Sequence, residues 1–438
     1  MCSKNESLIG ELKSISMKYL GVAWDRIPLI LTEGSGVTVK DIQGREYVDC
    51  TAQAWTLSTG YRHPKVIKAV KAQLDQIEDV FFTYDNIPML RLTQRLIEIT
   101  PEKFNKVFFS LSGSEAIEGA MRLAMRYTGG QEFVTLYHAY HGRTFITEAI
   151  SHTYPTYVSC KRGMEKFTPK PIRIPNFYCY RCYFDHKYPD CKLLCVKFLE
   201  NALKHQADTK VAGVILEPIQ ANGGQIIPPP GYLQELRRIC SENGVLLIYD
   251  EVQTGMGRCG KMFAADVYQV YPDILVIGKG LGAGFPLSCI ITNEKYGFME
   301  KGEWGFTYAG SPISCAAGLA VIDVLLEEKL IGNADKMGKL FLEGLNQLAK
   351  KYPIIGEIRG KGLMIGVEIV KDKNTKEPGP NETRKILMKA QEKGVLLGKS
   401  GLGPHGNVFK IKPALNISKQ QVAEVLRVLD EVLEEVAR

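Results

Sequence analysis

A lysine and an aspartate each end a short apolar run and could take part in chemistry together. Lys279 follows the run DILVIG and precedes a glycine-rich turn, while Asp250 ends the run GVLLIYD. Both runs are typical of buried parallel strands, whose carboxyl ends lie at one edge of a sheet. An amine and a carboxylate at that edge can hold opposite ends of a planar heterocycle. Either residue alone would also fit an ordinary buried ion pair, but the two together predict one shared site.

The pair suits pyridoxal phosphate (PLP), which needs a lysine for attachment and an acid beside its pyridine nitrogen. A phosphate site is predicted in residues 106–129, which read as a strand, a tight turn and a helix that starts near Ser112, Gly113 and Ser114. Free backbone N–H groups and the helix dipole favour an anion there. The alternative, a serine that only caps the helix, fits any helix. Because Lys279 and Asp250 predict a PLP site, we favour the phosphate site over a simple helix cap.

The elements that must position these residues alternate between strand and helix patterns over residues 64–325. Such alternation predicts an α/β fold with a mostly parallel sheet and helices on both faces. We expect 64–325 to be the large PLP-binding domain. Residues 1–63 contain short antiparallel strands and should join a smaller α+β lobe formed by residues 326–438.

Composition restricts the class of protein. The chain has 438 residues, too many for one typical core, with 45% hydrophobic and 24% charged residues. The net charge of +7 is spread without a basic block, so we expect no nucleic-acid partner. We find no run of membrane-spanning length and no signal-peptide layout at the N-terminus. These properties favour a cytoplasmic enzyme.

Six motifs together resemble class III PLP-dependent aminotransferases, from about residue 30 to the end. They are SGSEA (112–116), YHGRT (140–144), EPIQ (217–220), DEVQTGMGR (250–258), GKG (278–280) and TYAGSP (307–312). This family has the fold-type I architecture and includes ornithine, acetylornithine, 4-aminobutyrate and taurine or β-alanine aminotransferases. The resemblance implies a PLP-dependent transaminase.

The resemblance also implies a role for each matching residue. Lys279 would be the Schiff-base lysine and general base, and Asp250 the partner of the pyridine nitrogen. The other implied cofactor contacts are Ser112, Gly113 and Ser114 at the phosphate, Gln253 at the ring hydroxyl, Tyr140 on the ring face, and Thr307 at the phosphate of a neighbouring subunit. The Thr307 match implies a homodimer or homotetramer with shared sites. For Tyr140, a core aromatic is the alternative.

The sequence departs from the family where many relatives carry R-x-x-P-P near the C-terminus. That arginine holds a substrate carboxylate and pairs with the EPIQ glutamate, here Glu217. In VFKIKPAL, Lys410 takes its place and Ala414 replaces the second proline. Lysine lacks the planar bidentate grip of arginine, so binding of an α-carboxylate is not predicted. Lys410 either faces Glu217 or is a solvated surface charge.

Trp55 aligns with an aromatic residue that lines the donor pocket of taurine-type ω-aminotransferases. A bulky wall and a weak α-carboxylate clamp favour a donor with a terminal amine, such as β-alanine, 4-aminobutyrate or taurine. Pyruvate or 2-oxoglutarate would be the 2-oxo acid acceptor. Two alternatives remain: a racemase or epimerase of the same family, and an amine lyase or decarboxylase. A lysine at position 410 also occurs in phospholyase-like relatives.

The segment NFYCYRCYFDHKYPDCKLLC holds four of the eleven cysteines, Cys179, Cys182, Cys191 and Cys195. The C-x-x-C spacing suits a metal knuckle, and the C-x-x-x-C spacing is looser. A zinc clip, free thiols and redox-formed disulfides all fit this segment, so we assign no metal ligands. The remaining cysteines are expected to be buried, at positions 2, 50, 160, 240, 259, 289 and 315.

Overall fold

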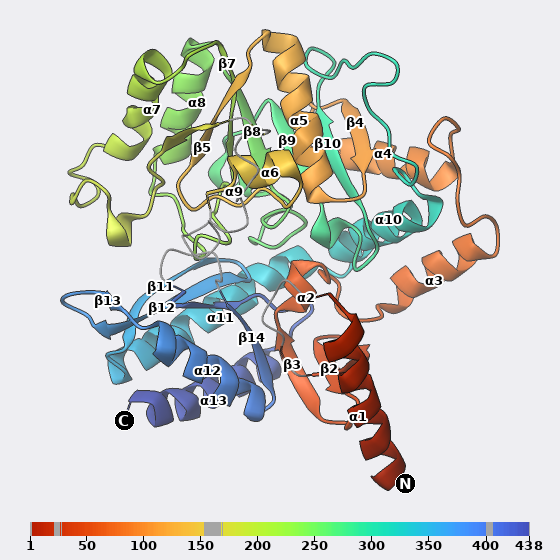
Figure 1. Cartoon of the computed structure of the whole chain (residues 1–438), viewed down its shortest axis with the longest axis vertical. Helices are drawn as coiled ribbons and strands as arrows, with labels where there is room; N and C mark the ends of the chain where they lie inside the picture. The colour runs from red at the N-terminus through yellow and green to blue at the C-terminus, as the bar shows by residue number, and fades with distance from the viewer. Residues whose placement is uncertain are drawn as a thin grey trace.

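The computed structural model describes residues 2–21, 27, 29–152, 168, 170–399 and 406–437, in which two sheets lie one above the other in the view of Figure 1. The larger sheet has seven strands in the order β4 (Lys106–Ser110), β10 (Ser288–Thr292), β9 (Ile274–Ile277), β8 (Leu246–Asp250), β7 (Val211–Leu216), β5 (Glu132–Leu136) and β6 (Ile172–Ile174). Strand β10 is antiparallel to both neighbours, and the other pairs are parallel. The prediction of a mostly parallel sheet is confirmed.

Both faces of this sheet are buried, which explains why its strands read as continuous apolar runs. In β8, Leu246 and Ile248 pack in one hydrophobic cluster with α5 (Gly113–Thr128). Leu247 and Tyr249 point to the opposite face and join the cluster that contains residues of α7 (Leu194–His205) and α8 (Tyr232–Glu242). Helices therefore cover both faces, as predicted. The remaining helices of this region are α3 (Pro64–Leu74), α4 (Ile87–Ile99), α6 (Phe145–Ile150), α9 (Ala264–Tyr268) and α10 (Pro312–Glu327).

The second sheet combines strands from both ends of the chain. Its order is β1 (Leu31–Ser35), β2 (Thr38–Asp41), β3 (Glu46–Cys50), β14 (Val395–Lys399), β15 (Val408–Ile411), β12 (Met364–Asp372) and β11 (Ile355–Lys361), with β13 (Glu377–Pro378) beside β12. The parallel pair β3–β14 joins the two ends, seen as red and blue ribbons in Figure 1. We propose the division 1–63, 64–325 and 326–438 on this ground.

Helices surround the second sheet and connect it to the larger one. They are α11 (Leu330–Lys351), α12 (Pro380–Glu392) and α13 (Lys419–Ala437), with α1 (Cys2–Tyr19) at the N-terminus and the short α2 (Ala52–Trp55) after β3. None of the helices that the structure describes combines the length and apolarity that crossing a membrane requires.

Candidate active site

Seven of the predicted residues meet in one cavity of about 190 Å³. Strands β8 and β9 are parallel neighbours, so their carboxyl ends place Asp250 and Lys279 at the same edge of the larger sheet. The start of α5 and the loop after β5 close the cavity. The predicted residues that line it are Gly113, Ser114, Tyr140, Glu217, Asp250, Gln253 and Lys279.

Lys279 is held in an unusual environment for an amine. It is the first residue of the 3-10 turn η3 (Lys279–Leu281), and its φ of 42° is in the left-handed region that a residue with a long side chain rarely adopts. Burial lowers the pKa of Lys279, and the negative charges of Asp250 and Glu217 only partly oppose this shift. A buried amine with a lowered pKa spends more of its time neutral, as a base must.

Asp250 is fixed by a histidine that the sequence reading did not single out. The Asp250 Oδ2 atom lies 2.8 Å from Nδ1 of His141, and Oδ1 accepts a hydrogen bond from the Val252 backbone N–H at 3.1 Å. Because a carboxylate can only accept, Nδ1 of His141 is the donor. The Nε2 atom of His141 is buried, and the described part of the chain offers it no hydrogen-bond partner. His141 lies inside the YHGRT motif, so the signal was present.

The start of α5 forms a narrow cradle for an anion. Ser112 is the N-cap, and its side chain accepts a hydrogen bond from the Glu115 N–H, so its hydroxyl serves the helix. Ser114 Oγ accepts from the Arg143 N–H at 3.1 Å. A Cβ atom on Gly142 would lie 2.2 Å from Ser114 Oγ, so only glycine lets this loop approach the helix start. The N–H groups of Gly113 and Ser114, the first two residues of the helix, have no partner within the helix and are available to an anion.

Glu217 binds backbone groups rather than a lysine. Its Oε1 atom accepts from the Tyr140 N–H at 3.1 Å and Oε2 from the Ala221 N–H at 2.9 Å. Burial raises the pKa of Glu217 to about 7, and the nearby charge of Asp250 adds to this effect. Within the described ranges no ion pair joins Glu217 to Lys410. Glu217 thus connects the loop of Tyr140 to the end of β7.

Three lysines surround the ring of Trp55. The Nζ atoms of Lys279, Lys410 and Lys412 lie 5.4, 4.7 and 3.6 Å from the centroid of the Trp55 ring. Lys410 and Lys412 are each only 1% exposed, so the interpretation of Lys410 as a solvated surface charge is wrong. The sequence did not single out Lys412, which directly follows β15, although residues two apart in an extended chain share a face. Its Nζ donates to Gln253 Oε1 at 3.2 Å.

Burial of these lysines shifts their titration. Burial, reinforced by the charge of Lys279, lowers the pKa of Lys410 to about 7, and Glu217 opposes the shift. Burial and the charge of Lys410 lower the pKa of Lys412 well below its ordinary value. Two buried amines beside an aromatic wall, with no acid paired to either in the described residues, form a site that an anion would stabilise.

Thr307 does not reach this cavity. It lies in the loop before α10 and is exposed, next to Tyr308, which is 58% exposed. The structure of one chain therefore places Thr307 apart from the other predicted residues.

Comparison with known proteins identifies the family. The sequence model of the class-III aminotransferases matches residues 19–433. The chain belongs to this family. It is 35% identical over 430 residues to an acetylornithine aminotransferase of Methanothermobacter thermautotrophicus, covering 97% of this chain and 99% of the relative. A leucine/methionine racemase of Thermococcus litoralis is 34% identical over 440 residues, covering 99% and 96%.

A solved structure supports the same family. An amine transaminase from an uncultivated Pseudomonas species, in its PLP-bound form, superposes with a TM-score of 0.88 at 30% identity, covering 95% of this chain and 98% of that one. As a class III aminotransferase, this enzyme is PLP-dependent. The residues of the cavity fit this cofactor, because the narrow cradle at Gly142 and Ser114 suits a phosphate, and a buried carboxylate, Asp250, and a buried amine, Lys279, line the same cavity.

Proposed function

We propose that this aminotransferase moves the amino group of an ω-amino acid, such as β-alanine, 4-aminobutyrate or taurine, to a 2-oxo acid such as pyruvate or 2-oxoglutarate. The observation that carries the proposal is the pair of buried lysines, Lys410 and Lys412, against Trp55 and close to Lys279. A donor whose acid group lies beside these two amines would present its far end, the terminal amine, to Lys279.

Each residue of the site would have its own role in amino transfer. PLP supplies withdrawal of electrons from the carbon that bears the substrate amine. Asp250, fixed by His141, would keep the pyridine nitrogen protonated, and Gln253 would donate to the ring hydroxyl. Lys279, with its lowered pKa, would take the proton from the amine-bearing carbon and return it on the cofactor side.

The remaining predicted residues would hold the cofactor in place. Gly113 and Ser114 would bind its phosphate at the start of α5, with Ser112 capping that helix. Tyr140 lines the cavity and would stack on the ring, and its backbone N–H is fixed by Glu217. These residues would hold the cofactor in place and would not exchange protons with the substrate. Their substitution should therefore weaken cofactor binding and leave the sequence of reaction steps unchanged.

We also propose a homodimer, or a tetramer built from it, in which Thr307 serves the neighbouring site. Phe82, whose ring lies close to Gly305, is 41% exposed, and Tyr84 and Ile87 are 69% and 74% exposed. Such large apolar side chains beside the Thr307 loop favour a covered surface. Light scattering coupled to size exclusion would measure the oligomeric state, and a monomer that is active at all concentrations would contradict this part.

The proposed substrate is tested with a panel of donors that differ in one group. β-Alanine, 4-aminobutyrate and taurine should yield the amino acid of the supplied 2-oxo acid, whereas propylamine, which lacks an acid group, should be a poor donor. Lys410→Met and Lys412→Met should lose activity with acid-bearing donors, and the exposed Lys385→Met should not. Conversion of α-amino acids alone would contradict the proposal. Loss of optical rotation without amino transfer would favour the racemase.

A further inference from the structure

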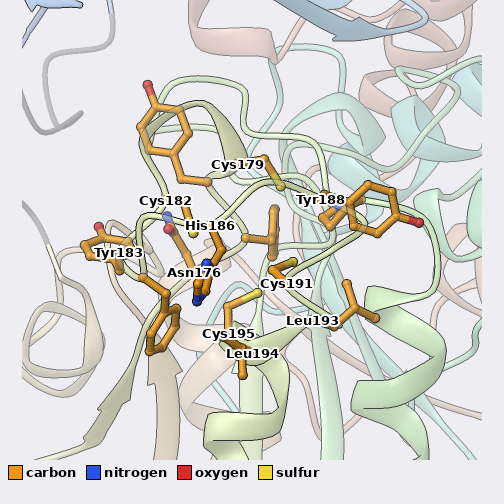
Figure 2. A pocket seen from close by; sticks show the side chains of 14 residues that line it. Asn176, Cys179, Cys182, Tyr183, His186, Tyr188, Cys191, Leu193, Leu194 and Cys195 are labelled. Carbon is orange, nitrogen blue, oxygen red and sulfur yellow. The ribbon is translucent and has the colours of Figure 1, made fainter. Parts of the chain in front are cut away.

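The segment with four cysteines forms a second cavity outside the active site (Figure 2). Cys179 begins the 3-10 turn η2 (Cys179–Arg181), Cys191 precedes α7, and Cys195 lies in its first turn. These three cysteines and Cys182 line the same cavity of about 20 Å³, room for about one water-sized body. All four are free thiols.

The four cysteines come from the turn at η2 and from the start of α7, and they border one small cavity. A soft divalent cation stabilises several thiolates at once, so a cavity bordered by four cysteines suits such an ion.

We propose that Cys179, Cys182, Cys191 and Cys195 bind one thiophilic divalent cation of the zinc type. The Cys-x2-Cys turn and the Cys-x3-Cys helix start supply the four ligands of a tetrahedral thiolate site. The positive end of the α7 dipole lies beside Cys191 and Cys195 and favours their thiolate forms. Binding would release the thiol protons to solvent without any change of oxidation state.

Cation binding must rotate the cysteine side chains. Among the described residues, no group of three or more His, Cys, Asp or Glu side chains is already arranged to hold a metal ion. Because the sulfur atom of cysteine is bonded directly to Cβ, a change of the χ1 rotamer alone redirects it. The site is therefore a cluster of converging ligands that the cation would draw together.

The cation would fix a segment that contacts the smaller sheet and two loops that follow strands of the larger sheet. On one side, Arg181 Nε donates to Glu368 Oε1 of β12 at 2.7 Å, and Tyr178 also donates to Glu368. On the other side, Asn176 Nδ2 donates to Gln220 Oε1 at 2.6 Å, and the Tyr183 hydroxyl contacts Nε2 of His138, two residues before Tyr140. The cysteine site thus lies between the smaller sheet and the loop that carries Tyr140.

The first test is the metal content of the full-length holoenzyme, purified without chelator after growth in zinc-supplemented medium. We expect one zinc ion per chain in the wild type and in Cys240→Ala, which removes a buried cysteine outside the cluster. Cys182→Ser and Cys191→Ser should lose the metal. Wild-type protein that contains no stoichiometric metal and binds no added zinc would overturn the proposal.

A second measurement uses the wild type alone and does not depend on the folding of the variants. Treatment with a chelator should make the cluster thiols reactive toward a thiol reagent, and added zinc should protect them again. Treatment with the chelator should also loosen the Tyr140 loop, which would be measured as faster release of PLP. Equal thiol reactivity with and without zinc would contradict the site, as would an intact mass that shows a disulfide.

Discussion

The pH dependence of donor selectivity follows from the environment of Lys410. Its pKa of about 7 means that the amine is about 90% charged at pH 6 and about 1% charged at pH 9. A charge-assisted hydrogen bond to the acid group of a donor contributes about 1.5–3 kcal/mol, or roughly 10- to 150-fold in binding. Recognition of an acid-bearing donor should therefore weaken about 10- to 100-fold as the pH rises from 6 to 9.

The assay is the ratio of kcat/KM for 4-aminobutyrate to kcat/KM for butylamine, measured across this range. The two donors carry the same kind of primary amine, so titration of the amine and of Lys279 affects both and largely cancels in the ratio. The ratio should fall above pH 7 in the wild type and should be low and flat in Lys410→Met. A flat ratio in the wild type, or an unchanged profile in Lys410→Met, would refute the reasoning.

Three further predictions concern single residues of the site. Lys410→Met should raise the melting temperature, because the pKa of Lys410 in the folded protein lies below its unfolded value of 10.5. Burial of this amine therefore lowers the free energy of unfolding by on the order of 5 kcal/mol at most below pH 7, and this cost fades as the pH approaches 10.5. An unchanged melting curve at pH 7 would contradict this. Lys279→Ala should abolish turnover while circular dichroism shows an intact fold, and full activity would overturn the assignment. Asp250→Asn should retain PLP by absorbance but lower kcat by roughly 10²–10³-fold, because an electrostatic partner of the reacting ring is lost; a wild-type rate would contradict its role.

The chemistry at the sheet edge could be predicted because it depends on local patterns. Apolar runs before Asp250 and Lys279 predict parallel strands, and parallel neighbours end at one edge of a sheet, so the two residues had to lie close together. The same holds for the turn at Ser112, where strand and helix adjoin in sequence. The serine nevertheless serves as the N-cap, a use that the sequence left open.

The donor side of the site depends on contacts between distant parts of the chain. The Trp55 ring meets Lys412 only because β15 enters the smaller sheet beside β14, which in turn pairs with β3, and no short-range pattern predicts that packing. The contact of His141 with Asp250 joins residues 109 positions apart. Burial of Lys410 also follows from this packing, since the sequence alone could not decide between a surface and a buried lysine.

The most direct test of the central claim is a titration of the purified holoenzyme with a single donor and no 2-oxo acid, followed by visible absorbance. The account predicts that β-alanine, 4-aminobutyrate or taurine removes the absorbance band of the resting cofactor and releases one equivalent of the corresponding aldehyde per site, and that pyruvate or 2-oxoglutarate restores the band. A band that persists with every ω-amino acid but disappears with α-amino acids would contradict it.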